Sequence, residues 1–119
     1  IAMNHVEIGI TSPPGATARI REAQVAKPAA TLAFTDAGLV SNPTQTDPDQ
    51  WIEVEKTATL YMRPPTDSYF ASTDPVRLVA RHNKRAPVGF VDGHGELMKP
   101  SETGMGFPQG DPRALWDKQ

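Results

Sequence analysis

The Asp92-Gly93 pair, which stands between two apolar stretches, constrains the fold of this chain more than any other feature. A tight hairpin turn of type I′ requires positive φ at both central residues, and Asp and Gly tolerate this conformation. The pair therefore predicts an antiparallel hairpin in which Asp92 and Gly93 form the loop. Its two strands should cover residues 87–91 and 94–98.

A two-residue loop also predicts which side chains share a face of the hairpin. Phe90 should lie opposite Gly95, and side chains alternate along each strand, so one face should be apolar and pack on the core. This face carries Val88, Phe90 and Leu97. Glu96 should be exposed. Residues 76–82 alternate as well, and the polar connection 83–86 would make them the first strand of a three-stranded meander.

His82 and Asp92 raise the question of an acid–base pair. In the predicted meander His82 begins a loop, whereas Asp92 lies at the far end of the next strand. About five residues at roughly 3.3 Å each would separate the two by on the order of 15 Å, so we predict no catalytic pair. His82 should hydrogen-bond a backbone group, and Asp92 and Gly93 should serve the turn. We find no motif of a catalytic site in the sequence and expect that the protein is not an enzyme.

The other segments predict short elements between long loops. They comprise a strand at 5–10, one or two helical turns at 17–26, a strand at 31–36 that ends at Ala37-Gly38, a short strand at 51–55, and a helix start at 111–116. Residues 41–50 and 63–75 lack apolar periodicity and should form two long loops.

The composition favours short strands over helices, because 12 prolines and 9 glycines occur in 119 residues. With 38% hydrophobic residues, the chain can form a modest core. We predict an α+β, mostly β fold: a single antiparallel sheet of about four strands, with long loops and little helix. The length corresponds to one globular domain over residues 1–119.

Charge and residue chemistry exclude several classes of site. A net charge of −2 is no footprint for nucleic-acid binding, and the absence of cysteine excludes disulfides and thiol chemistry. The three histidines, His5, His82 and His94, lack the spacing of a zinc site. We therefore predict no metal site and no cofactor. One alternative is a calcium ion held by loop carboxylates. These belong to Asp47, Asp49, Asp67 and Asp74.

The run from Arg81 to Leu97 resembles the processing-associated domain at the C-terminal end of many prepilin-type proteins. Its pattern is a His, nine residues and an Asp-Gly pair, which stands here as His82, Asp92 and Gly93. The stretches 1–4 and 25–36 are also similar to early parts of such domains. We carry over His82, Asp92 and Gly93 as signature residues, without a catalytic role.

The resemblance implies a structural subunit, of the pilin-like or pseudopilin kind, of a type II secretion or type IV pilus-like system. Such a subunit works by protein–protein contact outside the cytoplasmic membrane, in the periplasm or at the cell surface. Its partners would be other pilin-like subunits or proteins of the secretion machinery. An N-terminal apolar helix, which this chain does not contain, would anchor the full-length protein in the membrane.

A ligand-binding surface domain outside the cytoplasm is the alternative, for carbohydrate or calcium. It would be built from the loops 41–50 and 63–75. Such a domain predicts a concave site in which an aromatic residue lies beside loop carboxylates. The aromatic candidates are Trp51, Tyr61 and Tyr69. A hydrolase is a third reading.

Overall fold

The computed structural model describes residues 2–4, 24–55, 61–66, 70 and 75–118. The predicted strand at 5–10 lies outside these residues, as do most of the predicted helical turns at 17–26 and most of the loop 63–75.

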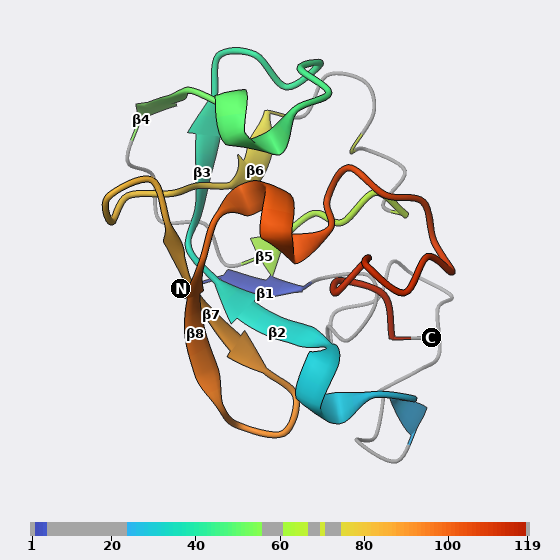
Figure 1. Cartoon of the computed structure of the whole chain (residues 1–119). Helices are drawn as coiled ribbons and strands as arrows, with labels where there is room; N and C mark the ends of the chain where they lie inside the picture. The colour runs from blue at the N-terminus through green and yellow to red at the C-terminus, as the bar shows by residue number, and fades with distance from the viewer. Residues whose placement is uncertain (1, 5–23, 56–60, 67–69, 71–74, 119) are drawn as a thin grey trace, which may run out of the picture.

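The described residues form two sheets (Figure 1). The first has five strands in the order β5-β1-β2-β7-β8, with bounds β1 Ala2–Asn4, β2 Leu32–Thr35, β5 Tyr61–Met62, β7 Ala86–Phe90 and β8 Gly95–Met98. The second has three strands in the order β4-β3-β6, with bounds β3 Ala37–Val40, β4 Glu53–Glu55 and β6 Val76–Leu78. The strand pairs are antiparallel, except that β1 and β5 run parallel.

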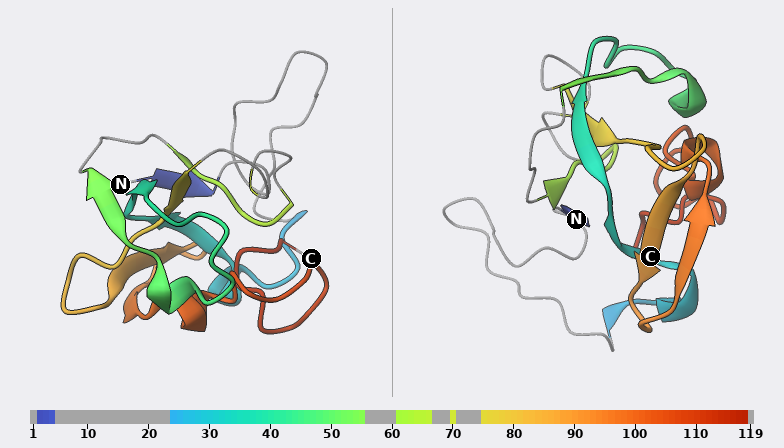
Figure 2. Two further views of the ribbon diagram at one scale, coloured as in Figure 1. Left: turned by 90° about the horizontal axis from the view of Figure 1, so that it is seen from above. Right: turned by 90° about the vertical axis from the view of Figure 1, so that its left-hand side faces the viewer.

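Helix is scarce in the described part of the chain and takes the form of short 3-10 turns. They include η2 (Pro28–Ala30), η3 (Pro48–Gln50) and η4 (Pro100–Thr103). The predicted class, mostly β with long loops and little helix, is confirmed. The strands divide between two sheets, and the three-stranded sheet lies at the opposite end of the molecule from the tip of the β7–β8 hairpin (Figure 2).

The chain passes from one sheet to the other at Asp36. β2 ends at Thr35 and β3 begins at Ala37, so the prediction that Ala37-Gly38 ends the strand is wrong. The backbone N–H of Val79 donates to the Asp36 carbonyl at 3.0 Å and holds this corner. The apolar residues from Ala37 onward therefore form a second strand in the other sheet instead of a turn after the first strand.

One hydrophobic cluster joins the five-stranded sheet to the C-terminal segment. Its buried members are Ala2, Leu32, Ala37, Met62, Leu78, Ala86, Val88, Phe90, Met98, Met105, Ala114 and Trp116. The Trp116 side chain is completely buried, and its indole N–H donates to the carbonyl of Gly104 at 2.9 Å. Gly104 has φ 80°, and a Cβ there would meet the Arg113 carbonyl, so this close approach requires glycine.

The predicted helix start at 111–116 is wrong, because this segment forms successive turns. Its capping residue behaves as expected: Asp111 accepts a hydrogen bond from the backbone N–H of Arg113. The backbone N–H of Leu115, however, donates to the carbonyls of Thr103 and Arg113. Contacts with distant backbone and the burial of Trp116 thus override the local helix signal.

The β7–β8 hairpin has a loop of three residues, not two. The N–H of Phe90 donates to the carbonyl of His94, and the N–H of Gly93 donates to that of Phe90. Gly93 has positive φ, 97°, but Asp92 does not, which fits a turn followed by a glycine in the left-handed region. The prediction of a two-residue type I′ loop at Asp92-Gly93 is therefore wrong.

The extra loop residue shifts the strand register by one and reverses the face of β8. Val88 now pairs with Glu96, and Pro87 pairs with Leu97. A shift of one residue moves every side chain of a strand to the other face. Leu97, predicted to be buried, is 59% exposed, whereas Phe90 is buried as predicted. Glu96 is exposed, as expected.

A two-residue turn of the I′ kind does occur, at Asn83-Lys84. His82 and Arg85 exchange backbone hydrogen bonds of 3.0 Å, and the two central residues have φ of 51° and 62°. This turn leads from β6 in the three-stranded sheet to β7 in the five-stranded sheet. The predicted meander of 76–82, 87–91 and 94–98 is therefore wrong, because its first strand pairs with β3 instead of β7.

Replacing Gly93 with Val should destabilise the protein by about 1–2 kcal/mol, because a β-branched residue resists positive φ. Nothing lies within 4 Å of a Cβ at this position, so the loss would come from the backbone alone. Gly95→Val, on β8 and without positive φ, is the matched control. Equal urea midpoints for the two variants would contradict this account of the loop.

Replacing Lys84 with Gly should stabilise the protein by about 0.5–1 kcal/mol. Glycine removes a left-handed strain of about 1–2 kcal/mol, offset in part by its larger loss of conformational entropy. Lys84→Ala removes the same side chain but keeps the strain, and it should give no such gain. Thermal and urea unfolding of the three proteins would measure both differences.

Candidate functional site

The signature residues His82 and Asp92 each have their own partner. His82 Nε2 lies 3.4 Å from the Asp36 carboxylate, and Asp92 Oδ1 lies 2.5 Å from His94 Nδ1. The structure does not bring His82 and Asp92 together, in agreement with the distance argument from the sequence. The expected partner of His82 was a backbone group, whereas its side chain contacts a carboxylate.

The contact between His82 and Asp36 ties the Asn83-Lys84 turn to the junction of the two sheets. Asp36 lies between β2 and β3, and its carbonyl already accepts from Val79. The His82 side chain is 60% exposed, and an exposed pair of this kind contributes at most about 1 kcal/mol. The geometry describes a surface brace at a chain crossing.

The second signature residue, Asp92, organises the tip of the hairpin. Its carboxylate accepts hydrogen bonds from the ring and from the backbone N–H of His94. The ring hydrogen bond, with the backbone bond next, lowers the pKa of Asp92. The His94 ring stacks on Phe90 with a centroid distance of 4.4 Å and an interplanar angle of 2°. Asp92 therefore positions a ring that covers the end of the core.

The carboxylates of the loop 41–50 are engaged within the protein. Asp47 accepts from the backbone N–H of Asp49 and caps η3. Asp49 accepts from the backbone N–H of Ser101 at 2.8 Å and from its hydroxyl at 2.6 Å. In the described part of the chain, no group of three or more His, Asp or Glu residues is arranged to hold a metal ion. Asp67 and Asp74 lie outside that part.

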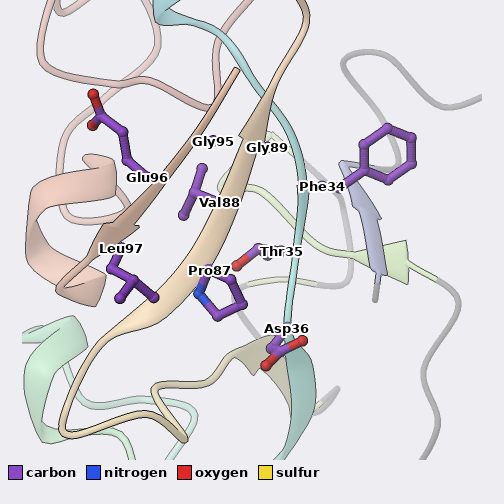
Figure 3. A pocket seen from close by; sticks show the side chains of 9 residues that line it. All are labelled: Phe34, Thr35, Asp36, Pro87, Val88, Gly89, Gly95, Glu96 and Leu97. Carbon is purple, nitrogen blue, oxygen red and sulfur yellow. The ribbon is translucent and has the colours of Figure 1, made fainter. Parts of the chain in front are cut away.

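An apolar groove of about 680 Å³ runs over the outer face of β2, β7 and β8 (Figure 3). Its lining residues are Phe34, Thr35, Asp36, Pro87, Val88, Gly89, Gly95, Glu96 and Leu97. Phe34 and Leu97 lie on opposite sides of the groove, with the Pro87 ring between them (Figure 3). Gly89 and Gly95, which face each other across β7 and β8, leave its floor open.

The groove results from the register of the hairpin. Gly89 pairs with Phe34 on one side and with Gly95 on the other, so the aromatic ring has no large neighbour on this face. Phe34 is 43% exposed and Leu97 is 59% exposed. Both residues lie in apolar runs that the sequence assigns to strands. Alternation along a strand predicts the wrong face for a side chain when the predicted register differs from the real one by one residue, so the sequence did not reveal that Leu97 is exposed.

A second hollow, which we call the cleft, has a volume of about 470 Å³ and lies among η3, β4, the end of β6 and η4. Its lining includes the segments 48–53 and 78–81, together with Lys84, Lys99 and Pro100. η3 and η4 lie side by side at this place (Figure 1), joined by the Asp49–Ser101 hydrogen bonds. The cleft and the groove share no lining residue.

Of the aromatic residues expected beside loop carboxylates, Trp51 lines the cleft near Asp49 and Glu53. Tyr69 and the side chain of Tyr61 lie outside the described part of the structure. The cleft also contains Lys84, which the sequence places in a solvated basic cluster at a strand edge and loop, and Lys99, which sequence reasoning did not single out. The unusual φ of Lys84 is the signal that draws attention to the first of them.

Comparison with models of known protein families, with curated proteins and with solved structures gave no match. Among the described residues, we find no helix with the length and apolar character that a membrane crossing requires.

Asp92 should make stability depend on pH at the acidic end. The pKa of Asp92 is lowered in the folded protein. The carboxylate therefore contributes fully to the free energy of unfolding above the ordinary aspartate pKa of about 3.9, and this contribution is lost as the pH falls through the lowered value. Asp92→Asn should therefore lower the urea midpoint at pH 6 more than at pH 2. His94→Phe, which keeps an aromatic ring over Phe90, should remove most of the same pH-dependent contribution to stability. An equal effect of Asp92→Asn at both pH values would contradict this role.

Proposed function

We propose that this protein is a structural subunit of the pilin-like or pseudopilin kind that acts by protein–protein contact outside the cytoplasmic membrane. The observation that carries the proposal is the apolar groove over β2, β7 and β8. The pattern of His82, Asp92 and Gly93 supplies the family resemblance, and with it the type II secretion or type IV pilus-like setting. The full-length protein would be anchored by an N-terminal apolar helix.

The groove has the character of a contact surface. Large exposed apolar patches on a folded domain mark contacts with proteins or membranes, or grooves for ligands, and we favour a protein contact here. Phe34 and Leu97 are 43% and 59% exposed, so each would contribute about 0.7–1.8 kcal/mol if a partner buried the exposed part. The occupant we propose is an apolar segment of a neighbouring subunit. Asp36 and Glu96 at the groove would favour basic groups beside that segment.

The positions of the signature residues support a structural role over a catalytic one. His82 braces the crossing between the two sheets, and Asp92 positions His94 over Phe90. Of the four residues in these two pairs, only Asp36 also lines the groove, and its carboxylate is already in contact with His82. The alternative function is a ligand-binding domain, and one of its possible ligands is calcium. Asp47 and Asp49 do not support a calcium site, because their carboxylate oxygens accept hydrogen bonds from the protein itself.

Leu97→Asp should reduce assembly by at least tenfold, because burying an unpaired carboxylate in an apolar contact costs more than about 1.4 kcal/mol. The measurement is the yield of chemically crosslinked multimers of the full-length protein in its own cells. Val54→Asp is the matched control, since Val54 is 62% exposed on β4 and lies outside the groove. Both variants should fold like the parent, because both positions are on the surface.

Two results would count against the proposal. One is a full yield of multimers from Leu97→Asp, which would remove the groove from assembly. The other is a full-length protein that fractionates with soluble proteins of the cell envelope instead of with its membranes. That result would favour the ligand-binding domain over the pilin-like subunit.

A further inference from the structure

The cleft contains two lysines without counterions. Lys84 lies in the turn after β6, and Lys99 immediately precedes η4. Within the described part of the chain, no carboxylate lies within ion-pair distance of either ammonium group. Two positive charges at one hollow, with no internal partner, favour an anion there.

The acidic residues of the cleft are already engaged. Glu53 pairs with Arg81 through contacts of 2.6–3.1 Å, so this pair is neutral as a unit. Asp49 directs both carboxylate oxygens to Ser101 on η4. The carboxylates of the cleft therefore serve the fold, and the cleft keeps a net positive charge, because Asp49 offsets only one of the two lysines.

The aromatic wall of the cleft, Trp51, is held in place by its surroundings. Its indole N–H donates to the Gln45 carbonyl at 2.9 Å, the Phe70 ring meets it edge-on at 6.3 Å, and the Arg77 guanidinium lies 5.7 Å from its centre. An aromatic side chain that is fixed before binding offers a flat apolar surface at little entropic cost.

The backbone at Lys84 is a second, independent observation. This residue has φ 62° at a turn position that glycine occupies without strain. Backbone strain of this kind concentrates at functional sites, where the side chain serves a purpose other than stability. Lysine at this position aims a long cationic side chain at the cleft.

We propose that the cleft binds an anionic sugar. The acidic group of the ligand, a carboxylate or a phosphate, would contact Lys84 and Lys99, and the apolar C–H face of the ring would lie on Trp51. A hollow of about 470 Å³ is within the size range of sites for small ligands. This site is independent of the proposed structural function, because it shares no residue with the groove.

The test is a titration of the ¹⁵N-labelled 119-residue protein followed by NMR at low salt. The probes are glucuronate, glucose 6-phosphate, glucose and inorganic phosphate. We expect both acidic sugars to shift the Trp51 indole signal and the amides around Lys84 and Lys99, with millimolar or tighter dissociation constants. Glucose and inorganic phosphate should each bind at least tenfold more weakly, since each lacks one half of the recognition.

Three variants separate the cleft from general effects of charge. Lys84→Gly and Lys99→Gln should each weaken binding about tenfold, the effect of losing one charged hydrogen bond. Lys27→Gln removes the same charge outside the cleft and should leave the affinity unchanged. Because Lys84→Gly should also raise stability, weaker binding by this variant cannot be attributed to unfolding.

Several outcomes would overturn the anionic-sugar site. One is that neither acidic sugar shifts the signals at a sugar concentration 20-fold above about 1 mM. Another is that inorganic phosphate binds as tightly as the acidic sugars. A third is that Lys27→Gln weakens sugar binding as much as the two variants of the cleft. Leu97→Asp, the groove variant, should bind the sugars like the parent. Failure of assembly and failure of sugar binding are thus separate results.

Discussion

Burial of the C-terminal segment against β1 and β2 is the constraint on which the rest of the structure depends. The buried amide of Asn4 donates to the carbonyls of Leu32 and Trp116, at 3.0 and 2.8 Å, and so joins three distant parts of the chain. The completely buried Trp116 donates in turn to Gly104. These polar groups are buried, so loss of one partner would leave the other without a hydrogen bond in the core. The free-energy cost would exceed the net contribution of the hydrogen bond. A segment with little regular structure thereby becomes part of the core.

The loop of the β7–β8 hairpin decides the character of the outer surface. One additional residue, Val91, places Asp92 where it accepts from His94 and places the His94 ring on Phe90. The same change turns Leu97 outward, beside Pro87 and across from Phe34. The apolar groove and the stacking of His94 on Phe90 at the hairpin tip are thus two consequences of a single register. The proposed protein–protein contact and a stable hairpin would not compete, because they use opposite faces of the same strands.

The strained turn at Asn83-Lys84 serves both the fold and the cleft. It carries the chain from β6 to β7, and His82 beside it contacts Asp36 at the junction of the sheets. It also brings Lys84 to the cleft, which the segment with Trp51 lines as well. Stability and the proposed anion binding would make different demands on position 84, since glycine suits the backbone and lysine suits an anion. His82 and Asp92 thus support the fold near these two surfaces.

Local chemistry, which the sequence alone reveals, determined the mostly β class, the short elements, the hairpin of 86–98, the positive φ of Gly93 and the capping by Asp111. These features depend on neighbours within a few residues. Only the tertiary structure decided the loop length of the hairpin, the division into two sheets at Asp36, and the turns that replace a helix at 111–116. The same holds for the exposure of Leu97 and for the partners of His82 and Asp49. Each of these depends on contacts between residues far apart in the chain, whose free energies exceed the differences of about 1 kcal/mol that separate one local conformation from another.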